Sequence, residues 1–309
     1  MIRGGYRDKE IQLWRTLDEI REALALSIGE FSDELGLSTN AFSSLQARRK
    51  SPPAPSMIRF ADRMNVSSDL LFSGTLDLNA LVRTYRGEKD VVPERYTHTA
   101  YARRRGVMPL FLGTERYIDP SASTYLHRRL QVSQTFLSDL DRPINLNCLV
   151  DTCNILAERY GCDAEAFRHM GQMSTKGNRG GRLDRILSRI ESPMELYECV
   201  FADLIQLFDE NWDYSIENLN MDSITIKVLP KEKIVEGFKT KTPGSSLLCE
   251  MKGGVGSSFS EFRRLPYSTV NHTKCIHRGD RECLYQFDYS LARSLSDKPQ
   301  AALIDFPNV

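Results

Sequence analysis

The segment 27–38 constrains the fold more tightly than any other part of the sequence. Ser27 and Glu30 have the spacing of a capping box, in which two side chains satisfy backbone groups at the start of a helix. Gly36 is the residue type that most often ends a helix in a left-handed conformation, and Ser38 is a favourable N-cap for a following helix. The segment therefore predicts two short helices joined by residues 36–38, which is a helix-turn-helix.

The second of these helices is expected over residues 39–47, with Phe42 and Leu45 on its buried face. Its other side chains are small and polar, and such side chains hydrogen-bond well to base edges in the major groove of DNA. Cationic side chains follow directly and would neutralise phosphates. We predict contacts to double-stranded DNA from Thr39, Asn40, Ser43, Ser44, Arg48, Arg49 and Lys50.

Residues 14–72 resemble the Xre/Cro type of phage-repressor DNA-binding domain. The residues that carry this resemblance are the segment 27–38 with Phe42, Leu45, Arg49, Pro52 or Pro53, Ala61, Val66 and Ser67. The resemblance implies an all-α domain of five helices that binds DNA. It also implies a homodimer, because one short recognition helix reads only a few base pairs.

The sequence departs from the pattern of that family at three positions. Ser32 stands where the family usually has Ala, Gln46 where it commonly has Glu, and Arg48 where it commonly has Gly. Arg48 adds a cation near phosphate, whereas Gln46 would weaken local helix packing. The alternative interpretation is a degenerate helix-turn-helix that no longer binds DNA, within a protein-interaction or cyclic-dinucleotide effector module.

The apolar period changes from helical to strand-like in the second half of the chain. Apolar residues recur at helical spacing through 121–170 and 192–208. Alternating residues then predict strands at 214–217, 223–228, 267–273 and 283–289. This order of elements predicts an α+β domain with an antiparallel sheet.

Residues 270–287 resemble the terminal hairpin of vinyl-reductase-like sensor domains, a superfamily similar to heme–nitric-oxide-binding domains. The pattern is Cys275, a turn at Gly279 and Asp280, and Cys283 before a strand flanked by aromatic residues. The resemblance implies a module that binds a small-molecule effector beside a DNA-binding domain. For the two cysteines, redox sensing or metal binding competes with simple packing of the hairpin. No Cys-x-x-Cys pair occurs, so no metal site is expected from spacing.

Several residues are candidates for ligand binding. Arg179 and Arg182 lie in a basic, glycine-containing segment that suits an anion, and His272 and His277 are candidate heme ligands. Because a lone histidine is more often structural, no cofactor is expected, and heme is kept as the alternative. The glycine-rich segment 252–258 predicts a turn, with a phosphate cradle as the alternative.

The composition is that of an ordinary soluble protein, with 27% charged and 41% hydrophobic residues. No stretch approaches the roughly 20 apolar residues that a membrane span needs, so we expect a cytoplasmic protein. No nucleophile elbow, His-Glu-x-x-His or Walker loop occurs, so we do not expect an enzyme. We expect a multidomain chain: a helix-turn-helix domain at 10–73, a linker at 74–106, an α+β ligand-sensing or dimerisation domain at 107–292, and a tail at 293–309.

Overall fold

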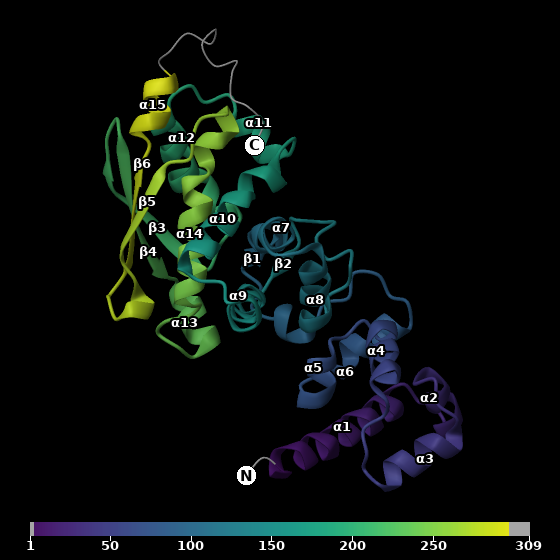
Figure 1. Ribbon diagram of the computed structural model, residues 1–309. Helices are drawn as coiled ribbons and strands as arrows, with labels where there is room; N and C mark the ends of the chain where they lie inside the picture. The colour runs from purple at the N-terminus through teal and green to yellow at the C-terminus, as the bar shows by residue number, and fades with distance from the viewer. Residues whose placement is uncertain (1–2, 297–309) are drawn as a thin grey trace. The chain divides into compact units, whose positions relative to one another are not determined.

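The computed structural model describes residues 3–296, which form two compact units (Figure 1). Unit 1 runs from the N-terminus to Thr97 and includes Ser121–Ser138, and unit 2 comprises His98–Pro120 and the chain from Asp139 onward. The chain therefore passes between the units more than once. Among the described residues, no helix is long and apolar enough to cross a membrane.

Unit 1 is helical. Its elements are α1 (Arg3–Ala23), α2 (Ile28–Glu34), α3 (Thr39–Ala47), α4 (Ala54–Arg63), α5 (Ser68–Ser73), α6 (Leu78–Tyr85), the 3₁₀ turn η1 (Glu94–Tyr96) and most of α8 (Pro120–Leu130). Three rings from separate helices form the centre of its core. Phe31 meets Phe42 and Phe60 edge to face, with ring centroids 5.9 and 5.4 Å apart. Edge-to-face contacts of this kind add to the burial energy of each ring, so they hold α2, α3 and α4 together.

The local signals at 27–38 are confirmed. Ser27 and Glu30 form both hydrogen bonds of a capping box, and the Ser38 side chain accepts a hydrogen bond from the backbone N–H of Ala41 at the start of α3. Gly36 adopts a φ of 63°, the left-handed conformation for which glycine is favoured. The strength of these signals comes from local backbone hydrogen bonds, which do not depend on the rest of the fold.

The expected linker at 74–106 is wrong, because most of this stretch is folded. Residues 74–97 belong to unit 1 and include α6, which Asp77 caps by accepting a hydrogen bond from the Ala80 backbone. The amide of Gln131, just beyond α8, bonds to both backbone groups of Asp77 at 2.7 and 3.1 Å. The tertiary bond to Gln131 could not be read from the local sequence, and 98–106 belongs to unit 2.

Unit 2 combines helices with an antiparallel sheet, as expected (Figure 1). The sheet has the order β3-β4-β6-β5, and a separate pair joins β1 to β2. The strands are β1 (Ala102–Arg103), β2 (Pro143–Ile144), β3 (Trp212–Leu219), β4 (Ser223–Pro230), β5 (Thr269–Lys274) and β6 (Cys283–Asp288). The α-helices are α7 (Met108–Tyr117), α9 (Leu146–Tyr160), α10 (Ala164–Asn178), α11 (Arg182–Leu187), α12 (Pro193–Cys199), α13 (Glu232–Phe238), α14 (Ser246–Ser257) and α15 (Ser290–Ser296).

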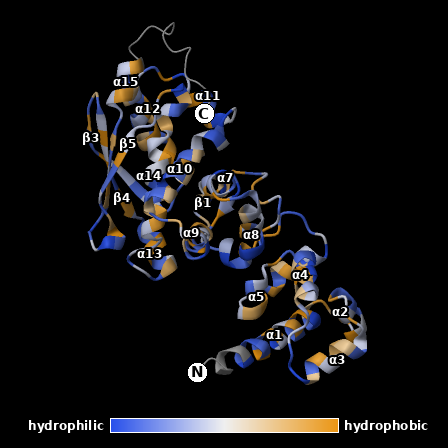
Figure 2. Cartoon of the chain, in the orientation of Figure 1, coloured by the Kyte–Doolittle hydropathy of each residue, from blue (hydrophilic) through white to orange (hydrophobic). Residues whose placement is uncertain are grey.

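Short irregular helices link these elements: η2 (Arg104–Gly106), η3 (Val200–Leu204), η4 (Ile205–Leu207), η5 (Phe259–Arg263) and η6 (Ile276–Arg278). Along β4, buried and less buried residues alternate, as a strand with one face against a core requires. Figure 2 shows hydrophobic and hydrophilic residues interleaved along the helices and strands of the unit. Of the expected tail, 297–309 lies outside the described residues.

The glycine-rich segment 252–258 is not a turn, because 252–257 forms the C-terminal half of α14 and Ser258 is the C-cap. Its glycines are explained by close packing. A Cβ on Gly254 would lie 2.0 Å from the carbonyl oxygen of Arg168 on α10, and a Cβ on Gly171 of α10 would lie 2.1 Å from the carbonyl oxygen of Met251. The two helices therefore pack backbone against backbone, which only glycine permits at these positions.

This packing predicts that alanine substitutions at two adjacent glycines of α14 change the free energy of unfolding differently. Gly254→Ala should destabilise unit 2 by about 2 kcal/mol or more, because the new methyl group meets immovable backbone. Gly253→Ala is the matched control, since its Cβ would find its nearest neighbour at 3.4 Å. The control should be neutral or up to about 1 kcal/mol more stable, because alanine favours helix. Urea unfolding of both variants measures the difference, and equal stabilities would contradict the close-packing explanation.

Candidate functional site

The outward face of α3 carries the side chains that were predicted to contact DNA. Phe42 is fully buried, whereas Thr39, Asn40, Ser43 and Ser44 are exposed. The predicted phosphate contacts Arg48, Arg49 and Lys50 are also exposed, directly after the helix. All seven predicted residues therefore lie on the surface of one short helix and the turn that follows it.

Hydrogen bonds from α1 hold this helix and turn in place. The Trp14 indole donates to the Lys50 carbonyl at 3.2 Å, and the Ser51 backbone N–H donates to the Glu10 carboxylate at 3.1 Å. The Gln46 amide donates to Asp18 at 2.9 Å, so the expectation that Gln46 weakens packing is wrong. Ser32 is buried, and its hydroxyl donates to the Gly29 carbonyl. The fold thus accommodates Ser32 and Gln46, two of the positions that depart from the Xre/Cro pattern.

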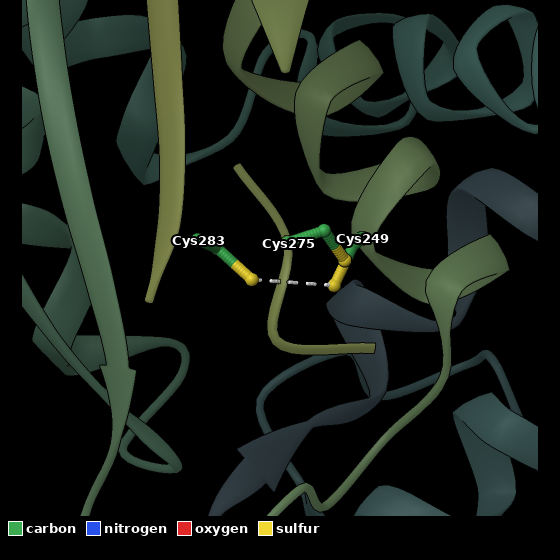
Figure 3. A group of neighbouring side chains, drawn as sticks. All are labelled: Cys249, Cys275 and Cys283. Carbon is green, nitrogen blue, oxygen red and sulfur yellow. Dashed lines mark hydrogen bonds between the residues drawn. The ribbon is translucent and has the colours of Figure 1, made fainter. Parts of the chain in front are cut away.

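Unit 2 contains a cluster of cysteines that the sequence analysis did not anticipate. The sulfur atoms of Cys249, Cys275 and Cys283 all lie within 4.8 Å of one another, and all three residues are buried (Figure 3). Cys249 comes from α14, Cys275 follows β5, and Cys283 begins β6. Antiparallel pairing of β5 with β6 brings the last two together, and α14 supplies the first. No short motif signals the cluster, because Cys249 is far from the hairpin in the sequence.

Two of the three cysteines in the cluster have a lowered pKa. Hydrogen bonding from Cys249 and from His272 lowers the pKa of Cys283 to about 4, against the opposing effect of burial. Hydrogen bonding to Cys249 likewise lowers the pKa of Cys275 to about 7, whereas the pKa of Cys249 itself is raised well above its ordinary value. Thiolates are the form in which cysteine binds metal.

His272 lies beside the cluster and is held by a buried carboxylate. Its Nδ1 atom is 2.9 Å from Glu250, and its ring stacks on Tyr285 with centroids 4.3 Å apart. Arg168 donates to the same carboxylate at 2.7 Å. Burial lowers the pKa of His272, but Cys283 and Glu250 outweigh that effect and raise it to about 9. His277 is half-buried on η6, and burial lowers its pKa.

These residues fit a tetrahedral metal ion with sulfur ligands. Zinc bound to thiolates at about 2.3 Å in tetrahedral geometry places two sulfurs about 3.8 Å apart. The sulfurs of Cys249 and Cys283 are 3.8 Å apart. The group of ligand atoms that lie within 4.8 Å of one another comprises the three sulfurs and does not include a nitrogen of His272.

A separate pocket opens between the helices and the sheet of unit 2. Its cavity volume is about 120 Å³. Apolar side chains form most of its wall, among them Leu183, Leu187, Val200, Phe201, Leu204, Ile205, Val255, Phe259 and Phe287. The polar side chains that line it are Arg105, Ser174, Asn178, Asp209, Tyr214, Lys252 and Tyr285.

The predicted ligand residues do not line this pocket. Arg179 ion-pairs with Asp184 and Glu261 and donates to the Phe262 carbonyl at 3.4 Å, so it ties the end of α10 to η5. Arg182 is exposed at the start of α11. His272 and His277 lie near the cysteine cluster and not at the pocket.

Comparisons with known proteins give a likeness of backbone only. No described protein family matches the chain, and no curated protein matches it either. Among solved structures, an H-NOX protein from S. oneidensis in the Fe(II) ligation state is similar, with a TM-score of 0.45 and 14% identity over 60% of this chain and 97% of that chain. An Fe(II) unliganded H-NOX protein mutant from K. algicida has a TM-score of 0.44 and 9% identity over 60% and 95% of the two chains. None of these comparisons supports the Xre/Cro resemblance of residues 14–72.

Proposed function

We propose that this protein is a sequence-specific DNA-binding transcription regulator in which unit 1 binds double-stranded DNA and unit 2 binds a small molecule. The observation that carries the proposal is the outward face of α3. Its polar side chains Thr39, Asn40, Ser43 and Ser44 are small and exposed, and three exposed cations follow directly after the helix. Such a helix suits the major groove, where amide and hydroxyl groups read base edges and flanking cations meet phosphates.

Asn40 and Ser44 occupy consecutive turns of this face, since residues four apart on a helix lie above one another. An asparagine can make two hydrogen bonds to adenine, so Asn40 is the residue we assign to base recognition. Arg48, Arg49 and Lys50 would set the register on the backbone. Two copies of the chain would read two half-sites, because one helix of this length covers only a few base pairs.

The pocket of unit 2 supports the sensing half of the proposal. It is concave, largely apolar and carries a few polar groups, which is the usual constitution of a small-molecule site. A ligand bound there would regulate DNA binding only if it had different affinities for the DNA-bound and free forms. We propose regulation rather than catalysis for this pocket.

DNA binding can be tested with purified full-length protein and genomic fragments over a salt series. Asn40→Ala should weaken binding to the selected site by about 1–3 kcal/mol, or roughly 5- to 150-fold, and relax preference at one base pair. Arg48→Gln should weaken binding to all sequences alike and reduce the salt slope by about one. Lys89→Gln removes an exposed charge outside the helix-turn-helix and serves as the control.

Absence of binding by the wild type at low salt would contradict the DNA-binding proposal. Binding that Asn40→Ala and Arg48→Gln leave unchanged would contradict the role assigned to α3. Either result would favour the protein-interaction module.

We further propose that Cys249, Cys275 and Cys283 bind a zinc ion. The 3.8 Å separation of the Cys249 and Cys283 sulfurs is the separation expected for two thiolates on one tetrahedral zinc ion. Bound zinc would cross-link α14 to the β5–β6 hairpin.

Zinc binding can be measured by metal analysis of protein kept reduced during purification. Wild type should contain stoichiometric zinc, and Co²⁺ substitution should give thiolate-to-metal absorption bands. Cys275→Ser should lose most of the metal and unfold at a lower temperature, because binding energy in such sites contributes to folding. Cys162→Ser, at a half-buried cysteine outside the cluster, should retain both. Metal-free wild type that does not take up Co²⁺ would refute the assignment.

A further inference from the structure

We infer that the pocket of unit 2 takes an apolar carboxylic acid, with its carboxylate against Lys252 and its hydrocarbon part against the apolar wall. This deepens the proposed sensing function and rests on it. At this pocket the carboxylate of Asp209 is fully hydrogen-bonded, whereas Lys252 and Arg105 each have a buried nitrogen without a hydrogen-bond acceptor among the described residues.

Asp209, the only acid among the pocket-lining residues, is already satisfied. Its Oδ1 atom accepts from the backbone and side-chain nitrogens of Asn211 at 3.2 and 2.7 Å. Its Oδ2 atom accepts from the Tyr214 hydroxyl at 3.2 Å and lies 3.3 Å from Lys252 Nζ. A ligand that needed a hydrogen-bond acceptor would therefore find this carboxylate fully used.

Lys252 is in the opposite state. Its Nζ atom is buried and contacts the Asp209 carboxylate and the ring of Trp212, whose centroid is 3.7 Å away. Within the described residues, no acceptor is placed to give it a well-formed hydrogen bond. An ammonium group has three N–H donors, and those of Lys252 are buried against the Asp209 carboxylate and the Trp212 ring.

A second cation at the pocket also has a spare donor. Arg105 hydrogen-bonds to Asn178 and to the exposed carboxylate of Asp141, and its guanidinium lies 5.0 Å from the centroid of the Phe208 ring. Its Nε atom is buried with no partner among the described residues. Each of the two cations at the pocket has one carboxylate partner, Asp141 for Arg105 and Asp209 for Lys252, and each keeps a buried nitrogen without a well-formed hydrogen bond.

Burial lowers the pKa of Lys252, and the nearby Asp209 carboxylate opposes that effect. A ligand carboxylate would complete its coordination with a charge-assisted hydrogen bond. The apolar wall excludes a small hydrophilic anion such as phosphate, because most of the buried surface would find no hydrogen bond. The combination selects a hydrophobic acid over an alcohol, an amine or an inorganic anion.

Calorimetric titration of the full-length protein tests this with matched probes. The probes are decanoic acid with decan-1-ol and decylamine, and 4-phenylbutyric acid with its alcohol and amine, each below its aggregation limit. In at least one set the acid should bind 10-fold or more tightly than the alcohol, and the amine should bind weakest. Lys252→Met should weaken acid binding about 10- to 100-fold and change alcohol binding by less than 3-fold.

Further variants separate charge from folding. Lys252→Arg should keep the preference for the acid, and Asp209→Asn should strengthen acid binding because it removes a competing anion. Lys241→Met, at an exposed lysine away from the pocket lining, should behave as wild type. Circular dichroism confirms that each variant is folded.

Equal affinity for acid and alcohol, or unchanged acid binding by a folded Lys252→Met, would overturn the carboxylate inference while leaving the pocket as a ligand site. Tighter binding of the amine would overturn it in the same way. If no probe bound to the wild type, the proposal that this pocket senses apolar ligands would fail as well. The DNA-binding half of the proposed function has its own assay and does not depend on these outcomes.

Discussion

The backbone contact between α10 and α14 is the constraint on which unit 2 depends. Gly171 and Gly254 allow the two helices to meet without intervening side chains, and an ion pair from Arg168 to Glu250 joins them at 2.7 Å. A helix held this closely has a fixed rotation about its own axis. Each side chain of α14 is consequently directed to one place: Cys249 to the cysteine cluster, Glu250 to His272, and Lys252 to the pocket.

The cysteine cluster and the pocket therefore share one helix, α14. Cys249 and Lys252 are three residues apart, so they lie on neighbouring positions one turn along the helix. Tyr285 links the same two regions from the sheet, since its hydroxyl donates to the Cys249 carbonyl at 3.1 Å and its side chain lines the pocket. A ligand that moved α14 would alter the geometry at the cysteines, and a metal at the cysteines would stiffen this wall of the pocket.

Unit 1 follows a simpler principle, because its hydrophobic and polar residues are separated by local periodicity. Phe42 enters the core while its neighbours Ser43 and Ser44 remain exposed, as the spacing on α3 predicts. The polar departures at Ser32 and Gln46 are satisfied by bonds to Gly29 and Asp18. The bond from Gln46 to Asp18 joins two helices that are distant in the sequence. The sequence pattern alone therefore predicted weaker helix packing at a position where the fold has a stabilising hydrogen bond.

The sequence by itself determined the elements whose signals are local. Capping at Ser27 and Ser38, the left-handed Gly36 and the alternation in β4 and β6 depend on backbone hydrogen bonds and on periodicity, which a linear pattern contains. Tertiary structure decided the features that join distant residues. Cys249 meets Cys275 and Cys283 only through the sheet, the glycines at 253–256 became helix because α10 and Phe287 pack against them, and Asp77 gained its partner from Gln131. Side-chain contacts between distant segments carry no periodic signal, so only the folded chain brings these groups together.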